Sequence, residues 1–314
     1  MTPEERYGLL VIFSIIIFVY VFAFGGLVRL LLKKFGFVKK EPKALQIWFR
    51  RIVFSLALFG FGCFAYAYFI EPYWLSVRNI EVKSAKLPKD SKPIRVVHIS
   101  DVHSDAKPRL EEKLPSAIAE QKPDLIVYSG DSLNSPEGLT VFRKLLTEIS
   151  KIAPTFVVRG NWDVWYWNNQ DLFGETGARQ LNGAAERLEI GGVPIWLAGV
   201  FVESEEKLSE TLEQIPKNEF SIFLFHYPDL IEEVSQAEID LYCAGHTHGG
   251  QVAMPFYGAL VTFSKFGKKY EGGTYKANNT WLNVNRGIGM EGGNVPRVRF
   301  WARPEITVID IIPE

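Results

Sequence analysis

Aspartate, asparagine and histidine side chains recur where short apolar stretches of this sequence end. In chain order these candidate residues are Asp101, His103, Asp131, Asn161, His226, His246 and His248. Each has an ordinary explanation by itself, because an Asp after a strand usually caps a helix or turn and a single His usually has a structural role. Seven together indicate a site, because ligands of open α/β sheets gather outside the carboxyl ends of the strands. His246 and His248 flank one Thr between glycines, a spacing that can aim two imidazoles at neighbouring ions.

The apolar stretches themselves are typical of β-strands. They cover residues 94–100, 125–130, 156–160, 194–200, 220–226, 239–245, 280–285 and 306–311. Segments with apolar residues spaced by three and four lie between several of them and predict helices. Strands that alternate with helices indicate an α/β domain with largely buried sheets. His98, the fifth histidine, lies inside the first strand, and we interpret it as structural.

Two long uncharged segments precede this domain. Residues 7–28 hold no charged side chain over 22 positions and residues 52–70 hold none over 19, so each is long enough to cross a bilayer as a helix. The loop between them, residues 29–51, carries eight basic side chains and one acidic one. After residue 70 the chain has 26 Lys and Arg against 33 Asp and Glu, although the 314 residues together have a net charge of −1. An acidic domain lacks the basic surface of nucleic-acid binding, so we expect no nucleic-acid partner.

The first apolar segment predicts a permanent anchor and not a cleaved signal peptide. The residues before it, TPEER, hold two acidic side chains and one Arg, whereas a signal peptide begins with a positive region. We therefore expect residues 1–70 to form a membrane module, residues 71–93 a polar linker and residues 94–314 the α/β domain. The oligomeric state is left open by the sequence.

The motifs of the α/β domain resemble those of the calcineurin-like metallophosphoesterases. SDVHSD, SGDS, RGNWD, LFHYPD and CAGHTHGGQ carry the Asp-x-His, Gly-Asp, Gly-Asn, His and Gly-His-x-His elements in the order that this family uses. GHTHGGQVAMPFYGAL, TWLNVNRGIG and RPEITVI resemble a membrane-associated bacterial branch with UDP-2,3-diacylglucosamine pyrophosphatases and YkuE-like phosphoesterases. The resemblance covers residues 94–312. It implies a four-layer α/β/β/α metallophosphoesterase fold with two packed β-sheets, and anchoring in the bacterial inner (plasma) membrane with the side left open.

Matching these motifs residue by residue implies a centre with two divalent metal ions. The implied ligands are Asp101, His103 and His248 for one ion, Asp131 as the bridge, and Asn161, His226 and His246 for the second ion. Two such ions acidify a bridging water and clamp a phosphate for in-line attack. The mixture of oxygen and imidazole donors suits manganese, which we expect, with magnesium, iron or zinc as alternatives.

Trp162 departs from the family pattern, which most often has His next to the Asn. That His stabilises the transferring phosphoryl group and helps the leaving oxygen accept a proton, whereas an indole offers one N–H donor and no acid–base chemistry. One interpretation is a degenerate enzyme, although all seven apparent ligands are retained. The other is a leaving group that needs no proton, such as the phosphate released from a pyrophosphate. Asp131, Asn161 and Trp162 are the candidate catalytic residues.

Aromatic residues near two of the motifs form a candidate substrate-binding wall. They are Trp165, Tyr166, Trp167, Phe256 and Tyr257. The alternative is that the first three pack under the edge of the sheet. Three consecutive aromatics cannot all point inward, so we expect at least one to face the cleft or the bilayer. Beside a membrane module, such a wall favours a membrane lipid or a lipid-linked nucleotide as the partner.

The sequence thus predicts a membrane-anchored hydrolase of phosphoester or pyrophosphate bonds. The specific expectation is hydrolysis of UDP-2,3-diacylglucosamine to 2,3-diacylglucosamine 1-phosphate and UMP, in lipid A biosynthesis. One alternative is an extracytoplasmic phosphodiesterase or phosphatase of YkuE type, and a non-enzyme alternative is a metal-binding membrane scaffold. The basic loop 29–51 is predicted in the cytoplasm, which puts the domain outside if both apolar segments cross. A lipid A precursor is within reach only if residues 52–70 lie along the interface instead.

Overall fold

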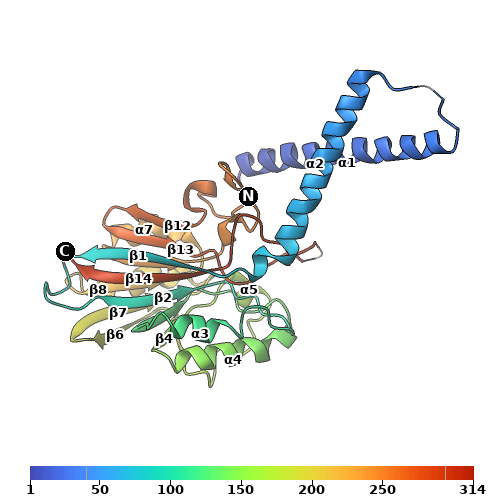
Figure 1. Cartoon of the computed structure of the whole chain (residues 1–314). Coiled ribbons are helices and arrows are strands. Elements are labelled where there is room, and N and C mark those ends of the chain that lie inside the picture. The colour runs from blue at the N-terminus through green and yellow to red at the C-terminus, as the bar shows by residue number, and fades with distance from the viewer. Residues whose placement is uncertain (40, 294) are drawn as a thin grey trace.

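A helical hairpin is attached to an α/β domain in the computed structural model, which describes residues 1–39, 41–293 and 295–314 (Figure 1). Helix α1 (Pro3–Lys34) is capped by Thr2, whose side chain accepts a hydrogen bond from the backbone N–H of Glu5. Helix α2 (Ala44–Phe69) returns to the domain. Helix α1 extends beyond both ends of its uncharged segment and α2 begins well before its own, because the Glu, Lys, Arg and Gln residues there also favour helix.

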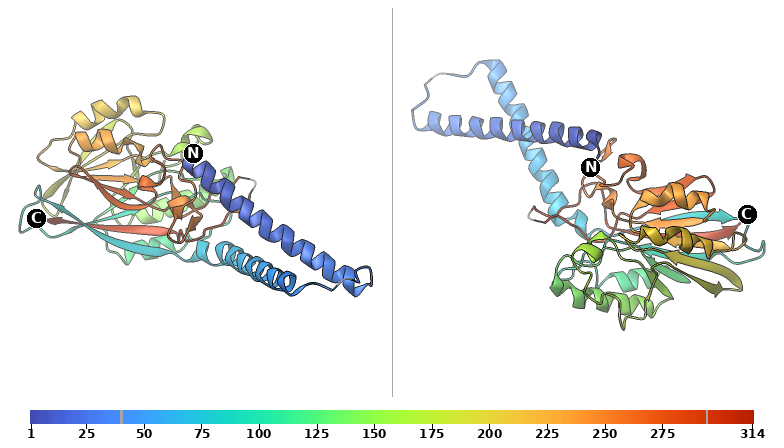
Figure 2. Two further views of the ribbon diagram at one scale, coloured as in Figure 1. Left: turned by 90° about the horizontal axis from the view of Figure 1, so that it is seen from above. Right: turned by 180° about the vertical axis from the view of Figure 1, so that it is seen from behind.

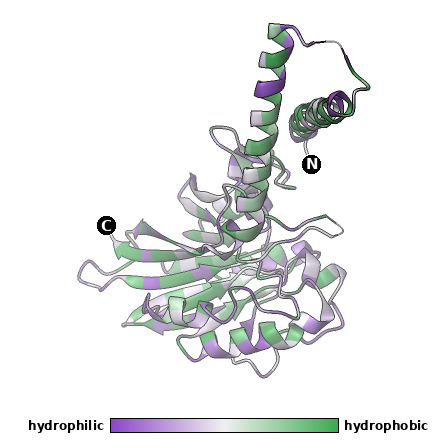
Figure 3. Cartoon of the chain, turned by 45° about the vertical axis from the view of Figure 1, so that its right-hand side comes forward, coloured by the Kyte–Doolittle hydropathy of each residue, from purple (hydrophilic) through white to green (hydrophobic). Residues whose placement is uncertain are grey.

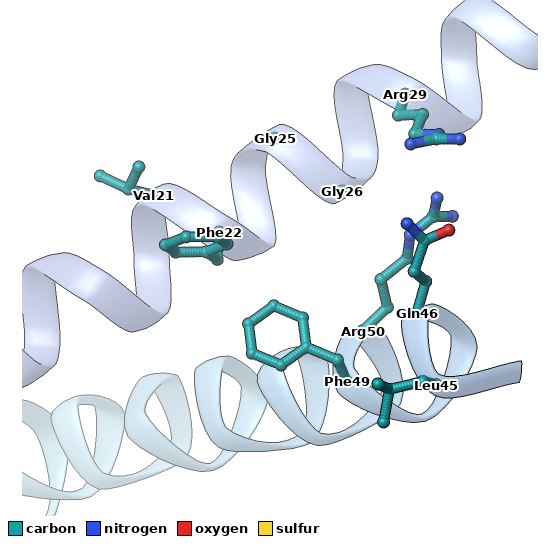
Figure 4. A pocket seen from close by; sticks show the side chains of 9 residues that line it. All are labelled: Val21, Phe22, Gly25, Gly26, Arg29, Leu45, Gln46, Phe49 and Arg50. Atoms are coloured by element: carbon teal, nitrogen blue, oxygen red, sulfur yellow. The ribbon is translucent and has the colours of Figure 1, made fainter. Parts of the chain in front are cut away.

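The two helices cross each other and leave most of their apolar side chains exposed. Exposed apolar residues occur along both helices, and Figure 3 shows many of them along α2. Where they cross, the hydroxyl of Tyr20 donates to the carbonyl of Ala57 at 3.2 Å, and the rings of Phe22 and Phe49 meet edge to face at 5.5 Å. An open cleft of about 710 Å³ separates the helices toward their connecting turn (Figure 4). Each helix is long and apolar enough to cross a membrane.

Both free ends of the hairpin are fixed to the domain (Figure 2). At the start of α1, the buried carboxylate of Glu5 accepts hydrogen bonds from the backbone N–H and the hydroxyl of Thr262, at 2.8 and 2.7 Å. At its other end, α2 continues through the 3₁₀ turn η1 (Glu71–Tyr73) into the first strand. The turn between the helices therefore lies on the side of the hairpin away from the domain.

Two six-stranded sheets form the domain. In the first sheet the order is β1 (Ser76–Ser84), β14 (Glu305–Pro313), β2 (Ile94–Ile99), β3 (Leu125–Tyr128), β4 (Thr155–Val157) and β5 (Arg179–Gln180). In the second the order is β12 (Gly273–Ala277), β13 (Thr280–Val284), β9 (Leu241–Ala244), β8 (Phe220–Leu224), β7 (Val193–Gly199) and β6 (Ala184–Ile190). A small ribbon pairs β10 (Ala253–Met254) with β11 (Gly258–Ala259).

Three apolar clusters show that the domain has four layers. The cluster between the sheets joins residues such as Val127 of β3 and Leu224 of β8. On the outer face of the first sheet lie α3 (Leu114–Ala119) and α4 (Leu139–Ser150), and on that of the second sheet lie α6 (Leu208–Glu213) and α7 (Ile231–Gln236). These layers confirm the predicted α/β/β/α fold, in which sheets covered on both faces take nearly continuous apolar strands.

The prediction of a linker over residues 71–93 is wrong for its central part. Residues 76–84 form β1, which pairs in parallel with β14 along its whole length at the edge of the first sheet. Only alternate side chains of β1 face the protein, and Glu81 and Lys83 point to solvent. An edge strand of this kind carries charged residues, which is why it reads as polar connecting chain in the sequence.

The strand directions place the candidate residues. β2, β3 and β4 run parallel in the first sheet, and β7, β8, β9 and β13 run parallel in the second. The loops that leave the carboxyl ends of these strands therefore meet at one edge of the two-sheet stack.

Candidate metal centre

The loops at this edge hold the candidate residues in an unusual backbone conformation. Five of the seven have a positive φ: Asp101 (49°), His103 (45°), Asp131 (63°), His246 (69°) and His248 (52°). Non-glycine residues rarely adopt this left-handed region, and such strain concentrates at functional sites.

Glycines let these loops approach one another. A Cβ on Gly160 would stand 2.2 Å from Oδ1 of Asp131, and one on Gly245 would stand 2.3 Å from Oδ2 of Asp101. No larger residue fits at either position without displacing a carboxylate. This explains why the Gly-Asn and Gly-His pairs occur where they do.

The first group of donors consists of Asp101, His103 and His248. Their candidate ligand atoms all lie within 4.8 Å of one another, and all three residues are buried. Nε2 of His248 is 3.3 Å from Oδ1 of Asp101. The structure thus brings together the three residues that the family motif implies for one ion.

A second group consists of Asp101, Asp131 and His226, again within 4.8 Å. Nε2 of His226 lies 3.2 Å from Oδ2 of Asp131 and 3.8 Å from Oδ1 of Asp101. The same Oδ2 of Asp131 is 3.6 Å from Nε2 of His103, in the first group. Asp131 therefore faces both groups, as a bridging ligand must, and Asp101 also contributes to both.

Unpaired polar atoms test whether metal ions fit these groups. Among the described residues, Oδ1 of Asn161, Nε2 of His226 and both ring nitrogens of His103 are buried without a hydrogen-bond partner. Buried polar atoms are normally paired, because an unsatisfied one costs about 1–3 kcal/mol. The rings of His103 and His226 lie beside the carboxylates of Asp131 and Asp101. Amide oxygen, imidazole and carboxylate together suit divalent transition metals. The donor set therefore fits a pair of divalent cations.

Charge in the site points to the same conclusion. Burial raises the pKa of Asp131 to about 6 against the opposing effect of His226. Burial lowers the pKa of His226, but the carboxylates of Asp131 and Asp101 outweigh it and raise that pKa to about 9. Burial also acts to raise the pKa of Asp101, but the imidazoles of His248 and His226 hold it well below its usual range. Two buried carboxylates thus depend on positive charge beside them, which metal ions supply.

His246 lies next to the second group and outside the two clusters. Its backbone N–H donates to both oxygens of Asp101 at 3.2 Å. Its ring lies edge to face against Tyr227 at 4.2 Å and near His226 at 5.2 Å. The structure places His246 beside His226, an implied ligand of the second ion.

Trp162 covers the first group of donors. Its ring stands edge-on to His103 at 5.1 Å and 88°, and it is half-buried. The backbone N–H of Trp162 donates to Oδ1 of Asp131 at 2.8 Å, and Nε1 donates to the carboxylate of Glu291 at 2.9 Å. The residue predicted to replace the family's His therefore lies at the site.

The three aromatics after Trp162 lie differently from one another. Trp165 and Tyr166 are exposed, and Nε1 of Trp165 donates to Glu203 at 2.7 Å. Trp167 is half-buried against the outer cluster of the first sheet and donates to the carbonyl of Leu133 at 3.0 Å. Only the first two therefore remain available for substrate in this conformation.

The aromatics after the histidine pair lie beside the hairpin. The side chain of Phe256 is fully exposed, and Tyr257 is partly exposed. The hydroxyl of Tyr257 would lie 2.7 Å from a Cβ on Gly8 of α1, so this loop contacts the first helix. These residues are placed at the border of the hairpin and the domain.

Two acidic residues at the site were not found from the sequence. The buried carboxylate of Asp163 accepts hydrogen bonds from the backbone N–H groups of Asp131, Ser132 and Gly160, at 2.9, 2.8 and 3.0 Å, and so ties two ligand loops together. Its position two residues after Asn161, at the start of α5 (Asn161–Trp165), is a helix-capping position that could have indicated this role. Glu291, the acceptor of Trp162, has no local sequence signal.

Comparisons with known proteins agree with this geometry. Residues 94–250 match the family model described as calcineurin-like phosphoesterase. The chain is 30% identical over 266 residues to the uncharacterized metallophosphoesterase YkuE of Bacillus subtilis (strain 168), covering 81% of this chain and 92% of that one. It is 28% identical over 266 residues to phosphodiesterase YaeI of Escherichia coli (strain K12), covering 81% and 93%. A solved dimetal phosphatase from Danio rerio is 12% identical with a TM-score of 0.40, covering 66% of this chain and 92% of that chain.

The ligand motifs, the two donor groups, the family-model match and the likeness to YkuE lead to one assignment: the chain belongs to the calcineurin-like phosphoesterase family and is a metal-dependent phosphoester hydrolase.

Proposed function

We propose that this enzyme is membrane-anchored and hydrolyses a phosphoester or pyrophosphate bond of a lipid-linked substrate on the extracytoplasmic side. The observation that carries the hydrolytic part is the set of buried, unpaired donor atoms of Asn161, His103 and His226 beside Asp101 and Asp131. Retention of Asp131, which faces both donor groups, argues against a scaffold without turnover.

The residues of the site divide the work of hydrolysis. When bound, a pair of divalent cations supplies an acidified water and a clamp for the phosphate oxygens. Asp131 and Asp101 would hold both ions, with His103 and His248 on one side and His226, Asn161 and His246 on the other. We propose manganese as the ion, since the donors combine carboxylate, amide and imidazole.

The presence of Trp162 at the site indicates which leaving groups the enzyme accepts. No described histidine outside the ligand set lies at the site, because His98 is buried in β2 and hydrogen-bonded to Ser129 and Asn283. The indole of Trp162 cannot protonate a leaving oxygen. A phosphate leaving group departs as an anion near neutral pH, whereas an alkoxide needs a proton. The site therefore favours pyrophosphates and other acidic leaving groups.

The arrangement of the hairpin indicates on which side of the membrane the catalytic domain lies. Both ends of the hairpin meet the domain through Glu5 and η1, and the basic loop 29–51 contains the distant turn. The positive-inside rule places such a loop in the cytoplasm, and the domain then lies outside. This arrangement favours the extracytoplasmic phosphodiesterase or pyrophosphatase over hydrolysis of UDP-2,3-diacylglucosamine, whose lipid A pathway operates on the cytoplasmic face.

Two measurements test the proposal. A reporter fused after Glu314 that is active only outside the cytoplasm is the expected result, and activity only inside would return UDP-2,3-diacylglucosamine to first place. Purified, metal-depleted protein supplied with Mn²⁺ should cleave a lipid diphosphate and an aryl phosphodiester. Absence of any hydrolysis with Mn²⁺, Mg²⁺, Fe²⁺ or Zn²⁺ would refute the enzymatic proposal.

A further inference from the structure

A cavity lined by charged and aromatic side chains lies where α2 enters the domain. It has a volume of about 280 Å³ and is lined by Tyr66, Glu71, Ser76, Arg286, Trp301 and Arg303. None of these residues belongs to the two donor groups of the metal centre. The cavity therefore needs an explanation of its own.

Two guanidinium groups in this cavity have no carboxylate within hydrogen-bond distance among the described residues. Arg303 packs over the ring of Trp74 at 4.1 Å and donates only to the carbonyls of Trp74 and Leu75, both at 3.0 Å. For Arg286 the nearest carboxylate oxygen is on Glu305 at 3.6 Å. The other oxygen of Glu305 already accepts a hydrogen bond from Arg78 at 3.2 Å. Both arginines thus retain donors for an anion.

Among the described residues that line the cavity, the acidic one is already engaged. Glu71 is buried, and its two oxygens accept hydrogen bonds from the backbone N–H groups of Trp301 and Ala302, at 2.9 and 2.6 Å. These bonds hold the start of η1 against the segment before β14. Glu71 is therefore a structural carboxylate, and neither arginine donates a hydrogen bond to it.

The cavity lies at the level where the apolar part of α2 ends. In the last turns of α2, the carbonyl of Ala67 accepts from the N–H of Arg299 at 3.0 Å, and Tyr66 meets Phe300 edge to face at 6.2 Å. Just beyond, Trp74 and Trp301 remain 52% and 62% exposed. Exposed Trp and Arg side chains at the end of a membrane-crossing helix are typical of the headgroup region.

We propose that this cavity binds the phosphate of an anionic membrane lipid through Arg286 and Arg303, with Trp301 alongside the glycerol and upper acyl chain. The proposal rests on the membrane anchoring proposed above, but not on catalysis. Guanidinium groups bind phosphate oxygens with two parallel hydrogen bonds, which favours arginine over lysine in such sites. A zwitterionic headgroup such as phosphocholine carries a cation of its own, which the guanidinium groups of Arg286 and Arg303 would repel.

Native mass spectrometry of the metal-depleted full-length protein in detergent tests this proposal. Phosphatidylglycerol, phosphatidylcholine or inorganic phosphate is added at matched concentrations. We expect one phosphatidylglycerol to be retained, at least tenfold less of it in the Arg286→Gln/Arg303→Gln double variant, and neither phosphatidylcholine nor inorganic phosphate retained. The control is Arg187→Gln, on β6, whose side chain pairs with Glu219 and lies on another part of the domain. It should bind phosphatidylglycerol like the unmodified protein.

A single variant guards against a folding defect. Arg303 also bonds two backbone carbonyls, whereas Arg286 has only its 3.6 Å ion pair, so Arg286→Gln alone should keep the melting temperature and still weaken phosphatidylglycerol binding severalfold. Equal retention of phosphatidylglycerol by the unmodified protein, Arg286→Gln and the double variant would overturn the proposal, as would retention of inorganic phosphate in place of lipid. Because no metal or turnover enters this measurement, its failure is distinct from a failure of the proposed hydrolysis.

Discussion

The indole of Trp162 is fixed between Glu291 and His103. Nε1 donates to the Glu291 carboxylate at 2.9 Å, and the ring edge meets the imidazole of His103 at 5.1 Å. Glu291 is held in turn by Gln251, since the backbone N–H and carbonyl of Glu291 both pair with the Gln251 amide, at 2.9 and 2.8 Å. The position that holds an acid in most of the family is thus occupied by an anchored, non-acidic ring.

Replacing Trp162 with His should change how the rate depends on the leaving group. A well-placed general acid contributes roughly 10²–10⁴-fold, so Trp162→His should raise kcat/KM on simple alkyl phosphodiesters and change it little on pyrophosphates. The measurement is kcat/KM for both proteins across leaving groups of graded pKa. Trp162→Phe serves as the control, because it removes the hydrogen bond to Glu291 without adding an acid. Parallel slopes for the unmodified protein and Trp162→His would show that position 162 does not act on the leaving group.

Replacing Asp131 with Asn should abolish most of the activity and lower metal content. The carboxylate faces His226 at 3.2 Å and His103 at 3.6 Å, so both donor groups lose its charge. We expect bound metal to fall from about two ions per chain toward one or none, as measured by mass spectrometry of acid-released metal. Full activity with two bound ions in Asp131→Asn would exclude the bridging role.

Replacing Asp163 with Asn should destabilise the site without removing a ligand. The Asn amide can accept on one side only, so at least one of the three buried N–H groups of Asp131, Ser132 and Gly160 loses its partner. We expect a loss of roughly 1–3 kcal/mol in unfolding free energy and a lower kcat. Asp124→Asn is the matched control, since Asp124 also accepts a backbone N–H, from Arg95 at 2.8 Å, but at an exposed position. Equal melting temperatures for the two variants would contradict this role.

His98 should make the protein sensitive to acid. Burial lowers its pKa to about 3, and its ring accepts from Asn283 and contacts Ser129 in the neutral form. In the unfolded chain a His titrates at about 6.5. Between these values the unfolded state binds a proton that the folded state does not, so stability falls as pH falls below about 6.5.

The variant His98→Gln lacks this titration. The stability advantage of the unmodified protein over His98→Gln should therefore shrink by roughly 2 kcal/mol between pH 6.5 and pH 5. Thermal unfolding of both proteins in detergent at pH 7.5, 6 and 5 measures it. A difference that stays constant over this range would mean that His98 is not buried in its neutral form.

The sequence carried more information about the ligand loops than about what holds them. Buried parallel strands are continuous apolar stretches of sequence. The ends of these strands can therefore be predicted from sequence alone, and Asp101, Asp131 and Asn161 lie at those ends. The edge strand β1 was not predicted, because only half of its side chains face the protein and its sequence is therefore not continuously apolar. The roles of Glu291 and Arg286 were not predicted for another reason. Both residues lie in loops whose course depends on the completed fold. Propensity and spacing carry no information on such contacts between distant segments.

The bond between Glu5 and Thr262 bears on which substrates the enzyme reaches. A soluble head on a single tether swings freely and samples many heights above a bilayer. Here the start of α1 and the end of α2 are both attached to the catalytic domain, so the domain cannot rotate freely relative to the hairpin. If the hairpin crosses the bilayer, the metal centre is then held at a fixed height above the membrane surface. It selects among phosphates by how far each projects from the lipid surface, as well as by their chemistry.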